Sequence, residues 1–295
     1  MPLYRAYGLV LACTLDLPLA PAEAGAVADV SIATALGEGR RSPRPVPERE
    51  LLRDGADWSL RFRDPAGHWL DYDFAAAAGT LTVAGSIDWE DAVPPLLGVV
   101  CAVLLSSAGE PLLHGAAVAH GGNALGILGD SGQGKSTLAA ALVGAGGRLL
   151  SEDLLAFTPR GEELEVEPGY PRISLLPDSF EALGFGGGAP QARQGTAKSW
   201  IDSAAPEGPA PIRRLYILAP PDPAAAAGAA RRLSRSAAAP ALVHHLYGAD
   251  WIRPVSRADL GFCASLAARV PIFELTRAAT LGEVPACAAM LLADA

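Results

Sequence analysis

The amino-acid sequence predicts an α/β fold with a smaller β-rich N-terminal domain. Residues 1–92 carry short apolar and β-branched runs that glycine, proline and aspartate separate, which is the pattern of strands. From residue 93 onward, strand-like apolar runs alternate with alanine- and leucine-rich helical ones. An apolar strand, a glycine-rich loop and a helix follow one another over 124–147. These observations predict an N-terminal domain, 1–92, and a larger α/β domain, 93–295.

Four strand-like segments make up the predicted N-terminal domain: "YGLVLACTLDL", "VADVSIATAL", "WSLRFRDPAGHWLDYDF" and "GTLTVAGSI". The polar, proline-rich stretch 37–50 predicts a loop or linker. Within the third segment, "RDPAG" at Arg63–Gly67 predicts the turn of a hairpin. The N-terminal domain is therefore expected to be built mainly from strands.

The second domain is expected to begin with an apolar helix over about 93–107. The Gly121–Gly122 pair predicts a hairpin whose second strand is "ALGILG", and "KSTLAAALVGAGG" predicts a helix that ends at its last glycines. The segment "RLLSEDLLAFTP" is predicted as one strand with two acids at its middle. A short hairpin, the strand "IRRLYILAP", the loop "PDPAAAAGAARR" and a helix–strand–helix tail are expected to follow.

Composition excludes several classes of protein. Half of the residues are hydrophobic and 19% are charged, which indicates a soluble globular chain. The net charge of -9 argues against a nonspecific nucleic-acid binder. The apolar N-terminal run is interrupted by Asp16, which favours a strand over a signal peptide, and the stretch Ala92–Gly109 is expected to be a buried helix, too short and proline-broken to span a membrane. Four cysteines without metal-type spacing favour reduced thiols in a cytoplasmic protein.

The glycine-rich loop fits the phosphate-binding pattern G-x-x-x-x-G-K-[ST] at every position. Its glycines allow successive backbone N–H groups to turn toward phosphate oxygens at the positive end of the following helix. Lysine at this position reaches the β- and γ-phosphates of ATP, and the adjacent serine ligates Mg²⁺. The predicted nucleotide site comprises Gly129, Asp130, Ser131, Gly132, Gln133, Gly134, Lys135, Ser136 and Thr137.

A second group of residues flanks this P-loop in the sequence. His114 lies on a predicted strand 15 positions before Gly129, and Glu152 and Asp153 follow Lys135 by 17 and 18 positions. A strand, the loop helix and a further strand bring such groups to one edge of a sheet. An acid near the γ-phosphate can hold Mg²⁺ or accept a proton from an attacking hydroxyl.

Together, "HGAAV", "GDSGQGKSTLA" and "LLSEDLL" resemble the catalytic core of the HPr kinase/phosphorylase family, serine kinases whose core is related to PEP carboxykinase. The resemblance covers about residues 93–200 and implies an α/β P-loop kinase core of this type that uses ATP and Mg²⁺. Carried over by position, it implies that Asp153 is the general base toward a serine hydroxyl. It also implies that His114 and Lys135 are active-site groups and that Ser136 is a Mg²⁺ ligand.

Three further positions depend on where the chain departs from the family. The first acid of the family is usually aspartate; here it is Glu152, whose role as a metal ligand or hydrogen-bond partner stays open. "VEPGYPRISL" makes Glu167 the candidate for a second metal-side acid, with a glutamate in a surface turn as the alternative. Lys198, one of only two lysines, is either a phosphate or substrate contact or a solvated side chain. His244 and His245 lack an acid or cysteine at metal-type spacing and are predicted to be structural.

The β-rich N-terminal domain and "PGYPRISL" resemble a subgroup of HPr-kinase-like proteins in peptide-biosynthesis clusters, which phosphorylate a serine of a ribosomal precursor peptide, as in lasso-peptide tailoring. We therefore expect a serine kinase for a peptide or small protein, with recognition in the N-terminal domain and no nucleic-acid or membrane partner. A P-loop ATPase, a nucleotide-binding regulator and a carrier-type binding module are the alternatives. The motif of the reverse, phosphorylase reaction is not evident, and a homo-oligomer stays open because bifunctional members are hexamers.

Overall fold

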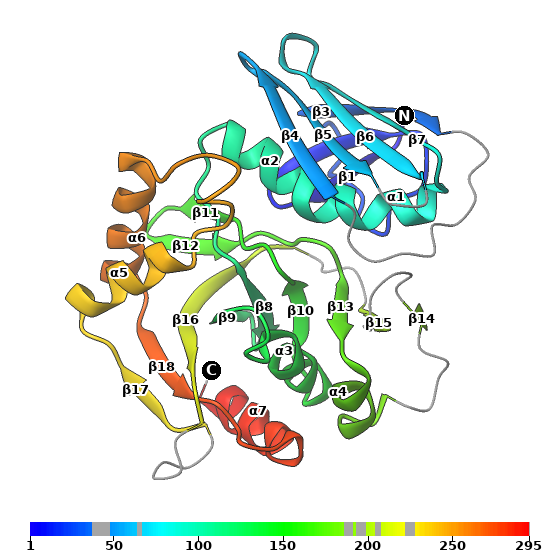
Figure 1. The fold of residues 1–295 in the computed structure, drawn as a ribbon. Coiled ribbons are helices and arrows are strands. Elements are labelled where there is room, and N and C mark those ends of the chain that lie inside the picture. The colour runs from blue at the N-terminus through cyan, green and yellow to red at the C-terminus, as the bar shows by residue number, and fades with distance from the viewer. Residues whose placement is uncertain are drawn as a thin grey trace.

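The computed structural model describes residues 1–36, 48–63, 67–185, 191–192, 199–203, 208–221 and 228–294. These residues form a mixed α/β structure with one seven-stranded, one eight-stranded and one three-stranded sheet (Figure 1). The first sheet lies in the N-terminal part of the chain, and the second carries helices on both faces. The predicted α/β class is confirmed at this level.

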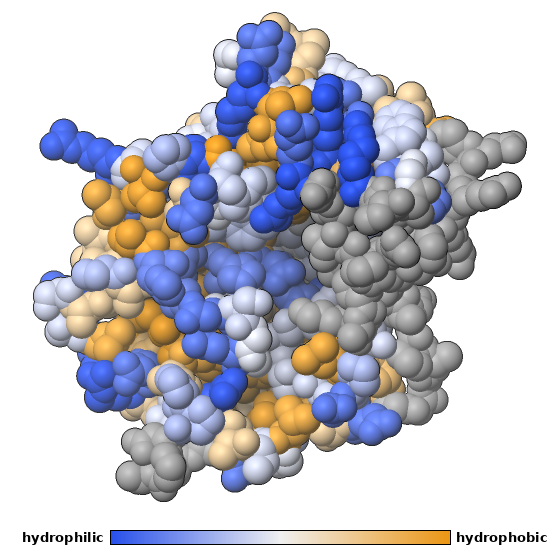
Figure 2. Space-filling view, in the orientation of Figure 1, coloured by the Kyte–Doolittle hydropathy of each residue, from blue (hydrophilic) through white to orange (hydrophobic). Residues whose placement is uncertain are grey.

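The seven-stranded sheet has the order β1-β2-β3-β7-β6-β5-β4, and its strands from β7 to β4 are antiparallel. Alternate residues point into the core, as for Leu60, Tyr72 and Leu81, while hydrophilic side chains gather over β4 to β6 on the face that Figure 2 shows. Its strands are β1 Leu3–Ala6, β2 Leu9–Cys13, β3 Val30–Leu36, β4 Glu48–Asp54, β5 Asp57–Arg63, β6 Trp69–Ala75 and β7 Thr80–Gly85, with a 3-10 turn Ala76–Ala78 before β7.

The prediction of a loop over 37–50 is wrong for its last three residues. Strand β4 begins at Glu48 and pairs with β5 through Glu48↔Arg63. Residues 37–47 of that stretch lie outside the described part of the chain. The hairpin predicted around "RDPAG" is present as the antiparallel pair β5–β6, although residues 64–66 of its turn are not described.

The apolar helix begins at Trp89, four residues before the expected start, and runs as α1 Trp89–Pro95, a π-helical segment Leu96–Val100 and α2 Cys101–Ser107. Pro94 and Pro95 lie inside the helix and do not break it, since Leu96 N still donates to Ala92 O and Val93 O. By length and composition the helix could cross a membrane, so the expectation that the stretch is too short was wrong. The expectation of a buried helix is confirmed, since 61% of its apolar window is buried inside the protein.

This helix belongs to the core of the first sheet. Tyr72 Oη donates to Ala92 O at 2.5 Å and Tyr7 Oη donates to Leu97 O at 2.8 Å, and the helix residues share one cluster with β2, β5, β6 and β7. The predicted division of the chain at 92/93 assigns the same helix to the second domain. That division stays a prediction.

The eight-stranded sheet positions the site. Three of its strands, β9, β16 and β18, run parallel, with β16 between the other two. Parallel strands end at the same edge of a sheet, so the segments after β9 and β18 lie near each other. Its strands are β8 Gly115–His120, β9 Asn123–Leu128, β10 Arg148–Ser151, β11 Phe157–Arg160, β12 Glu163–Val166, β16 Ala210–Ala219, β17 Ala230–Arg232 and β18 Ile272–Thr276.

Helices cover both faces of this sheet because apolar side chains alternate along its strands. On β9, Leu125 and Ile127 pack with α3 Lys135–Gly144 and α7 Val284–Ala293. Ala124 and Leu128 face the other side, toward α5 Arg235–His244 and α6 Arg257–Arg269. The remaining elements are α4 Pro177–Ala182, a 3-10 turn Leu281–Glu283 and a three-stranded sheet of β13 Arg172–Leu175, β14 Gln191–Ala192 and β15 Ser199–Asp202.

Three differences from the sequence prediction concern this part. The predicted strand "RLLSEDLLAFTP" is two strands, because β10 ends at Ser151 and a tight turn closed by Leu154 N to Glu152 O at 2.8 Å carries the acids. Strand β17 lies within the segment predicted as a loop, where it pairs with the edge of β18. Helix α5 was not predicted, although Ser234 caps its start by accepting from Ala237 N. The predicted Gly121–Gly122 hairpin, the helix after the glycine-rich loop and the helix–strand–helix tail are confirmed.

Candidate active site

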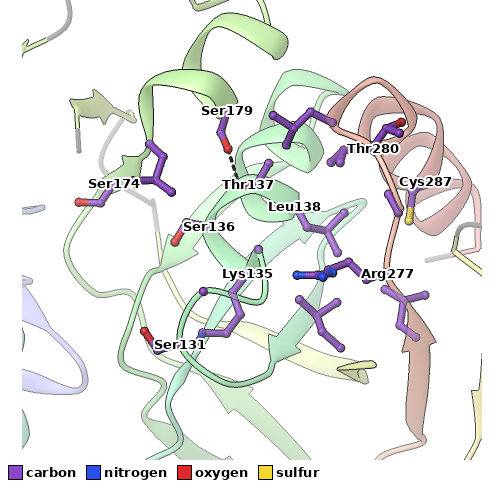
Figure 3. Close-up of a pocket in the computed structure, with 18 of the residues that line it drawn as sticks. Ser131, Lys135, Ser136, Thr137, Leu138, Ser174, Ser179, Arg277, Thr280 and Cys287 are labelled. Atoms are coloured by element: carbon purple, nitrogen blue, oxygen red, sulfur yellow. Dashed lines mark hydrogen bonds between the residues drawn. The ribbon is translucent and has the colours of Figure 1, made fainter. Parts of the chain in front are cut away.

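The glycine-rich loop, residues 129–134, joins the end of β9 to the start of α3 (Figure 3). Gly132 and Gly134 have φ angles of 80° and 90°, the left-handed region that favours glycine. Inside the loop, the Lys135 ammonium donates to Gly129 O at 2.7 Å and to Asp130 O at 3.1 Å. Gln133 Oε1 accepts from Asp130 N at 2.8 Å, which holds the loop closed. The loop therefore surrounds a buried cation.

The start of α3 adds a second positive feature. Gly134 is its N-cap, and within the described part of the chain no side chain caps the helix there. The first backbone N–H groups of a helix lack partners within the helix and lie at the positive end of its dipole. Lys135, Ser136 and Thr137 form this first turn and line an adjacent hollow. The residues present fit a phosphate group.

We call this space the first hollow; its volume is about 480 Å³. It lies among the glycine-rich loop, the turn after β10, strand β13, helix α4 and the segment between β18 and α7. It brings together eight of the predicted site residues: His114, Ser131, Gly132, Gly134, Lys135, Ser136, Thr137 and Asp153. Gly129 and Asp130 instead line a neighbouring second hollow, which also contains His114 and Ser131.

Asp153 lies in the tight turn after β10 with a left-handed φ of 66°. Its carbonyl oxygen accepts from His114 Nδ1 at 3.0 Å and from Gly115 N at 3.3 Å, which fixes the turn. Since a carbonyl can only accept, the neutral His114 ring carries its proton on Nδ1. The same turn places Asp153 on the lining of the first hollow, which Lys135 and Ser136 also line.

His114 is brought to the loop by a hairpin. It directly precedes β8, whose first residue, Gly115, pairs with Leu128 at the end of β9, immediately before Gly129. The His114 backbone N–H donates to His245 O at 2.8 Å, so both the ring and the main chain of His114 are held. The expected nearness of His114, the loop and Asp153 is therefore present in the structure.

Glu152 occupies a different position from its neighbour Asp153. Its side chain is 9% exposed, and Oε2 accepts from the backbone N–H of Ser174 on β13 at 2.9 Å. Ser174 in turn lines the first hollow, whereas Glu152 is not among the lining residues. Of the two roles left open for Glu152, the structure shows a hydrogen-bond partner that positions β13.

Glu167 is not among the residues that line the first hollow. It is 3% exposed, and its Oε2 is 3.9 Å from Arg5 Nη2 where the first sheet contacts the segment after β12. There Tyr7 N donates to Pro168 O at 2.6 Å, and this contact buries the glutamate. Its burial is not that of a glutamate in a surface turn, and its role as a metal-side acid stays a prediction. Lys198 lies outside the described residues.

Arg277 is a site residue that the sequence interpretation missed. It follows β18, lines the first hollow and lies beside the glycine-rich loop, with Cδ 3.9 Å from the position that a Cβ on Gly134 would take (Figure 3). The sequence could have indicated Arg277, because it directly follows the apolar strand β18. The parallel strands β9 and β18 end at the same edge of the sheet, so the residue after β18 lies near the loop after β9. Thr137 Oγ1 and Ser179 Oγ, 3.1 Å apart, join α3 to α4 on another side of the hollow.

The pair His244 and His245 also belongs to the site rather than to the core alone. At the end of α5, His244 Nε2 lies 2.9 Å from Asp130 Oδ1, and this hydrogen bond lowers the pKa of the Asp130 carboxyl. Burial lowers the pKa of His245 to about 4, with the nearby His244 adding to the effect. The prediction of purely structural histidines without an acid partner is corrected: the partner lies 114 residues earlier in the chain.

No family model matches the chain, and no curated protein matches it either. In a comparison with solved structures, the chain is similar to the HPr(Ser) kinase/phosphatase from Coxiella burnetii, with 11% identity and a TM-score of 0.35. The alignment covers 62% of this chain and 94% of the other. A similarity at this level carries no functional conclusion, so the function is inferred from the residues of the site.

Proposed function

We propose that this protein is an ATP- and Mg²⁺-dependent serine kinase that transfers the γ-phosphate to a serine hydroxyl of a peptide or small protein. The observation that carries the proposal is the meeting of Lys135, Ser136 and Asp153 on one hollow at the start of α3. The P-loop pattern and the resemblance to an HPr kinase/PEP carboxykinase-type core support the same chemistry.

Nucleotide phosphates would bind to the backbone N–H groups of the loop and of the first turn of α3. The Lys135 ammonium, held at the loop by two carbonyl oxygens, would contact the β- and γ-phosphates. The Ser136 hydroxyl is an oxygen ligand of the kind that Mg²⁺ prefers, so this side of the hollow fits the ion. Bound Mg²⁺ supplies positive charge that stabilises the transferring phosphoryl group.

Asp153 is the proposed general base. The serine Oγ forms a bond to the γ-phosphorus as the bond between that phosphorus and the β–γ bridging oxygen breaks, and ADP leaves. The proton of the serine hydroxyl moves to the Asp153 carboxylate. His114 positions this base, since its Nδ1 holds the Asp153 carbonyl at 3.0 Å.

The proposed acceptor is a ribosomally made, lasso-type precursor peptide, or a small carrier protein similar to HPr. The resemblance of the β-rich N-terminal part and "PGYPRISL" to peptide-tailoring kinases supports the first choice. In this proposal the first sheet recognises the acceptor, and the kinase acts in the cytoplasm, which the four free, buried cysteines support.

Intact mass spectrometry tests the proposal directly. The purified protein is incubated with ATP, Mg²⁺ and either the precursor peptide from a neighbouring gene or an HPr-like protein. One added phosphate on a serine is expected, and it should be lost with Asp153→Asn. Asp294→Asn is the matched control, because Asp294 is 70% exposed at the end of α7 and does not line the first hollow. ATP hydrolysis without transfer to either acceptor would contradict the kinase and favour a P-loop ATPase; ATP binding without turnover would favour a regulator.

A further inference from the structure

The second hollow, of about 300 Å³, lies beside the glycine-rich loop and shares His114 and Ser131 with the first hollow. Asp130 of the loop and the His244–His245 pair at the end of α5 line it together. One ligand atom from each of these three side chains lies within 4.8 Å of the other two. The shortest of these separations, His244 Nε2 to Asp130 Oδ1, is 2.9 Å.

The charges around the second hollow favour a cation. The carboxylates of Asp130 and Asp250 line it, together with the guanidinium of Arg49. That guanidinium lies over the Trp251 ring, 4.1 Å from the ring centre. The buried His245 lines the same hollow, and an imidazole can bind a metal through a ring nitrogen.

The positions of the three side chains suit a metal ion that reaches them from solvent. His245 is 6% exposed, and its main chain is fixed on both sides: its N–H donates to Leu242 O at 3.0 Å and its carbonyl accepts from His114 N at 2.8 Å. His244 and Asp130 are instead 67% and 57% exposed, so they leave the ion an entry path. Tetrahedral bonds of about 2.0–2.2 Å place neighbouring ligand atoms about 3.4 Å apart, so His244 Nε2 and Asp130 Oδ1 would separate slightly while any wider pair closes around the ion.

We propose that Asp130, His244 and His245 bind a divalent transition-metal ion, of the Zn²⁺ or Co²⁺ type, in the second hollow. Two imidazoles and one carboxylate select such ions over Mg²⁺ and Ca²⁺, which prefer oxygen ligands. Three protein ligands leave a fourth position for water.

The ion would connect the glycine-rich loop to the end of α5, because Asp130 belongs to the loop and its carbonyl accepts from Lys135. This site goes beyond the proposed kinase activity and does not depend on it. Its ligands include neither Ser136, the proposed Mg²⁺ ligand, nor Asp153, the proposed general base.

Cobalt titration of the metal-free full chain, with no nucleotide present, tests the site. We expect one Co²⁺ per chain with the intense visible absorption of a four-coordinate ion. His244→Ala should weaken binding by at least about tenfold, since loss of even an outer-shell partner costs about 10–100-fold. The exposed position of His244 keeps this variant folded. His120→Ala is the matched control: this histidine, at the end of β8, lies outside the cluster, and its loss should leave Co²⁺ binding unchanged.

Thermal unfolding provides a second measurement that does not depend on the spectrum. Zn²⁺ should raise the melting temperature of the wild type and of His120→Ala but not of His244→Ala, because an ion that binds only the folded state stabilises it. The proposal is overturned if Co²⁺ fails to bind, if binding is the same in His244→Ala and in wild type, or if binding is lost with Ser136→Ala instead.

Discussion

The turns at Tyr7 and Asp153 share a left-handed backbone conformation but differ in which of their atoms the rest of the protein contacts. Among the described residues, Tyr7 and Asp153 are the non-glycine residues with left-handed φ angles, 56° and 66°. Tyr7 is 2% exposed; its Oη donates to Leu97 O at 2.8 Å and accepts from Tyr170 N at 3.2 Å. Asp153 is exposed, and His114 Nδ1 donates to its backbone carbonyl.

The comparison separates a structural turn from a candidate catalytic one. At Tyr7, hydrogen bonds join the turn to Leu97 of the helix that packs on the first sheet and to Pro168 and Tyr170 after β12, and these buried contacts offset the cost of the backbone conformation. At Asp153, the same backbone fixes a carboxylate on a hollow beside an ammonium group. Changes near Tyr7 should therefore alter the stability of the fold, and changes near Asp153 should alter its chemistry.

The largest effect is expected from Asp153→Asn. An amide keeps the shape of the side chain but cannot accept the serine proton, so phosphoryl transfer should fall by about 10²–10⁴-fold. Transfer is measured as labelled phosphate on the acceptor at saturating ATP. Wild-type rates in this variant would show that the turn at Asp153 is structural, as at Tyr7.

Lys135→Met should lower transfer by about 10²–10³-fold, because it removes a preorganised charge at the phosphates while keeping an unbranched side chain. The free energy of unfolding should change far less than the activity. A variant that loses stability and activity together would instead indicate that the Lys135 ammonium mainly holds the loop through Gly129 and Asp130.

His245 is expected to be an exception to the separation between stability and chemistry. It lies beside the candidate site, yet its protonation should make the free energy of unfolding depend on pH. Its pKa is about 4 in the folded protein and about 6.5 when unfolded, so the unfolded chain takes up a proton first as the pH falls. In metal-free buffer, stability should fall between about pH 6.5 and 4 by at most about 3 kcal/mol from this group. His245→Gln should flatten that part of the profile in denaturant titrations; an unchanged slope would contradict the assignment.

Gly169→Ala tests the structural side of the comparison. A Cβ at Gly169 would overlap the Tyr7 ring and the Ser151 hydroxyl, so the free energy of unfolding should decrease by about 1–3 kcal/mol. Gly208→Ala is the control, because a Cβ there meets nothing within 4 Å. Equal stabilities for the two variants would show that the contact around Tyr7 can rearrange.

Arg277→Ala should have the smallest effect, raising the apparent KM for ATP by about tenfold through the loss of one charge-assisted contact. Arg277→Lys should recover part of that affinity. An unchanged KM in Arg277→Ala would place Arg277 at the rim of the first hollow rather than against the nucleotide.

The sequence predicts those parts of the site that are formed by residues close together in the chain. The loop, its lysine and the helix after it form one continuous segment, and the Gly121–Gly122 hairpin brings His114 back to that segment. Most strands of the first sheet follow from the alternation of apolar residues, as in β5 and β7. These features need only neighbouring residues to be recognised.

The remainder depends on contacts between distant segments. The His244–Asp130 hydrogen bond joins residues 114 positions apart, and no spacing rule covers it. The interruption between β10 and β11 arises because Leu113 exchanges backbone hydrogen bonds with Leu155, which turns the chain after the acids. Glu167 is buried by a first sheet that lies far away in the sequence.

The β8–β9 hairpin also determines where the chain can be lengthened. Its two strands pair from Gly115↔Leu128 to His120↔Asn123. His114 and the glycine-rich loop therefore lie at one end of the hairpin, and the Gly121–Gly122 turn lies at the other. Residues added between Gly121 and Gly122 would extend only the tip and leave the reactive end in register. One residue removed from β8 would instead turn Ala116 and Val118 toward the helices on the opposite face and carry His114 out of position. The tip is thus the natural point of attachment for a fluorophore or a tether that must not disturb the chemistry.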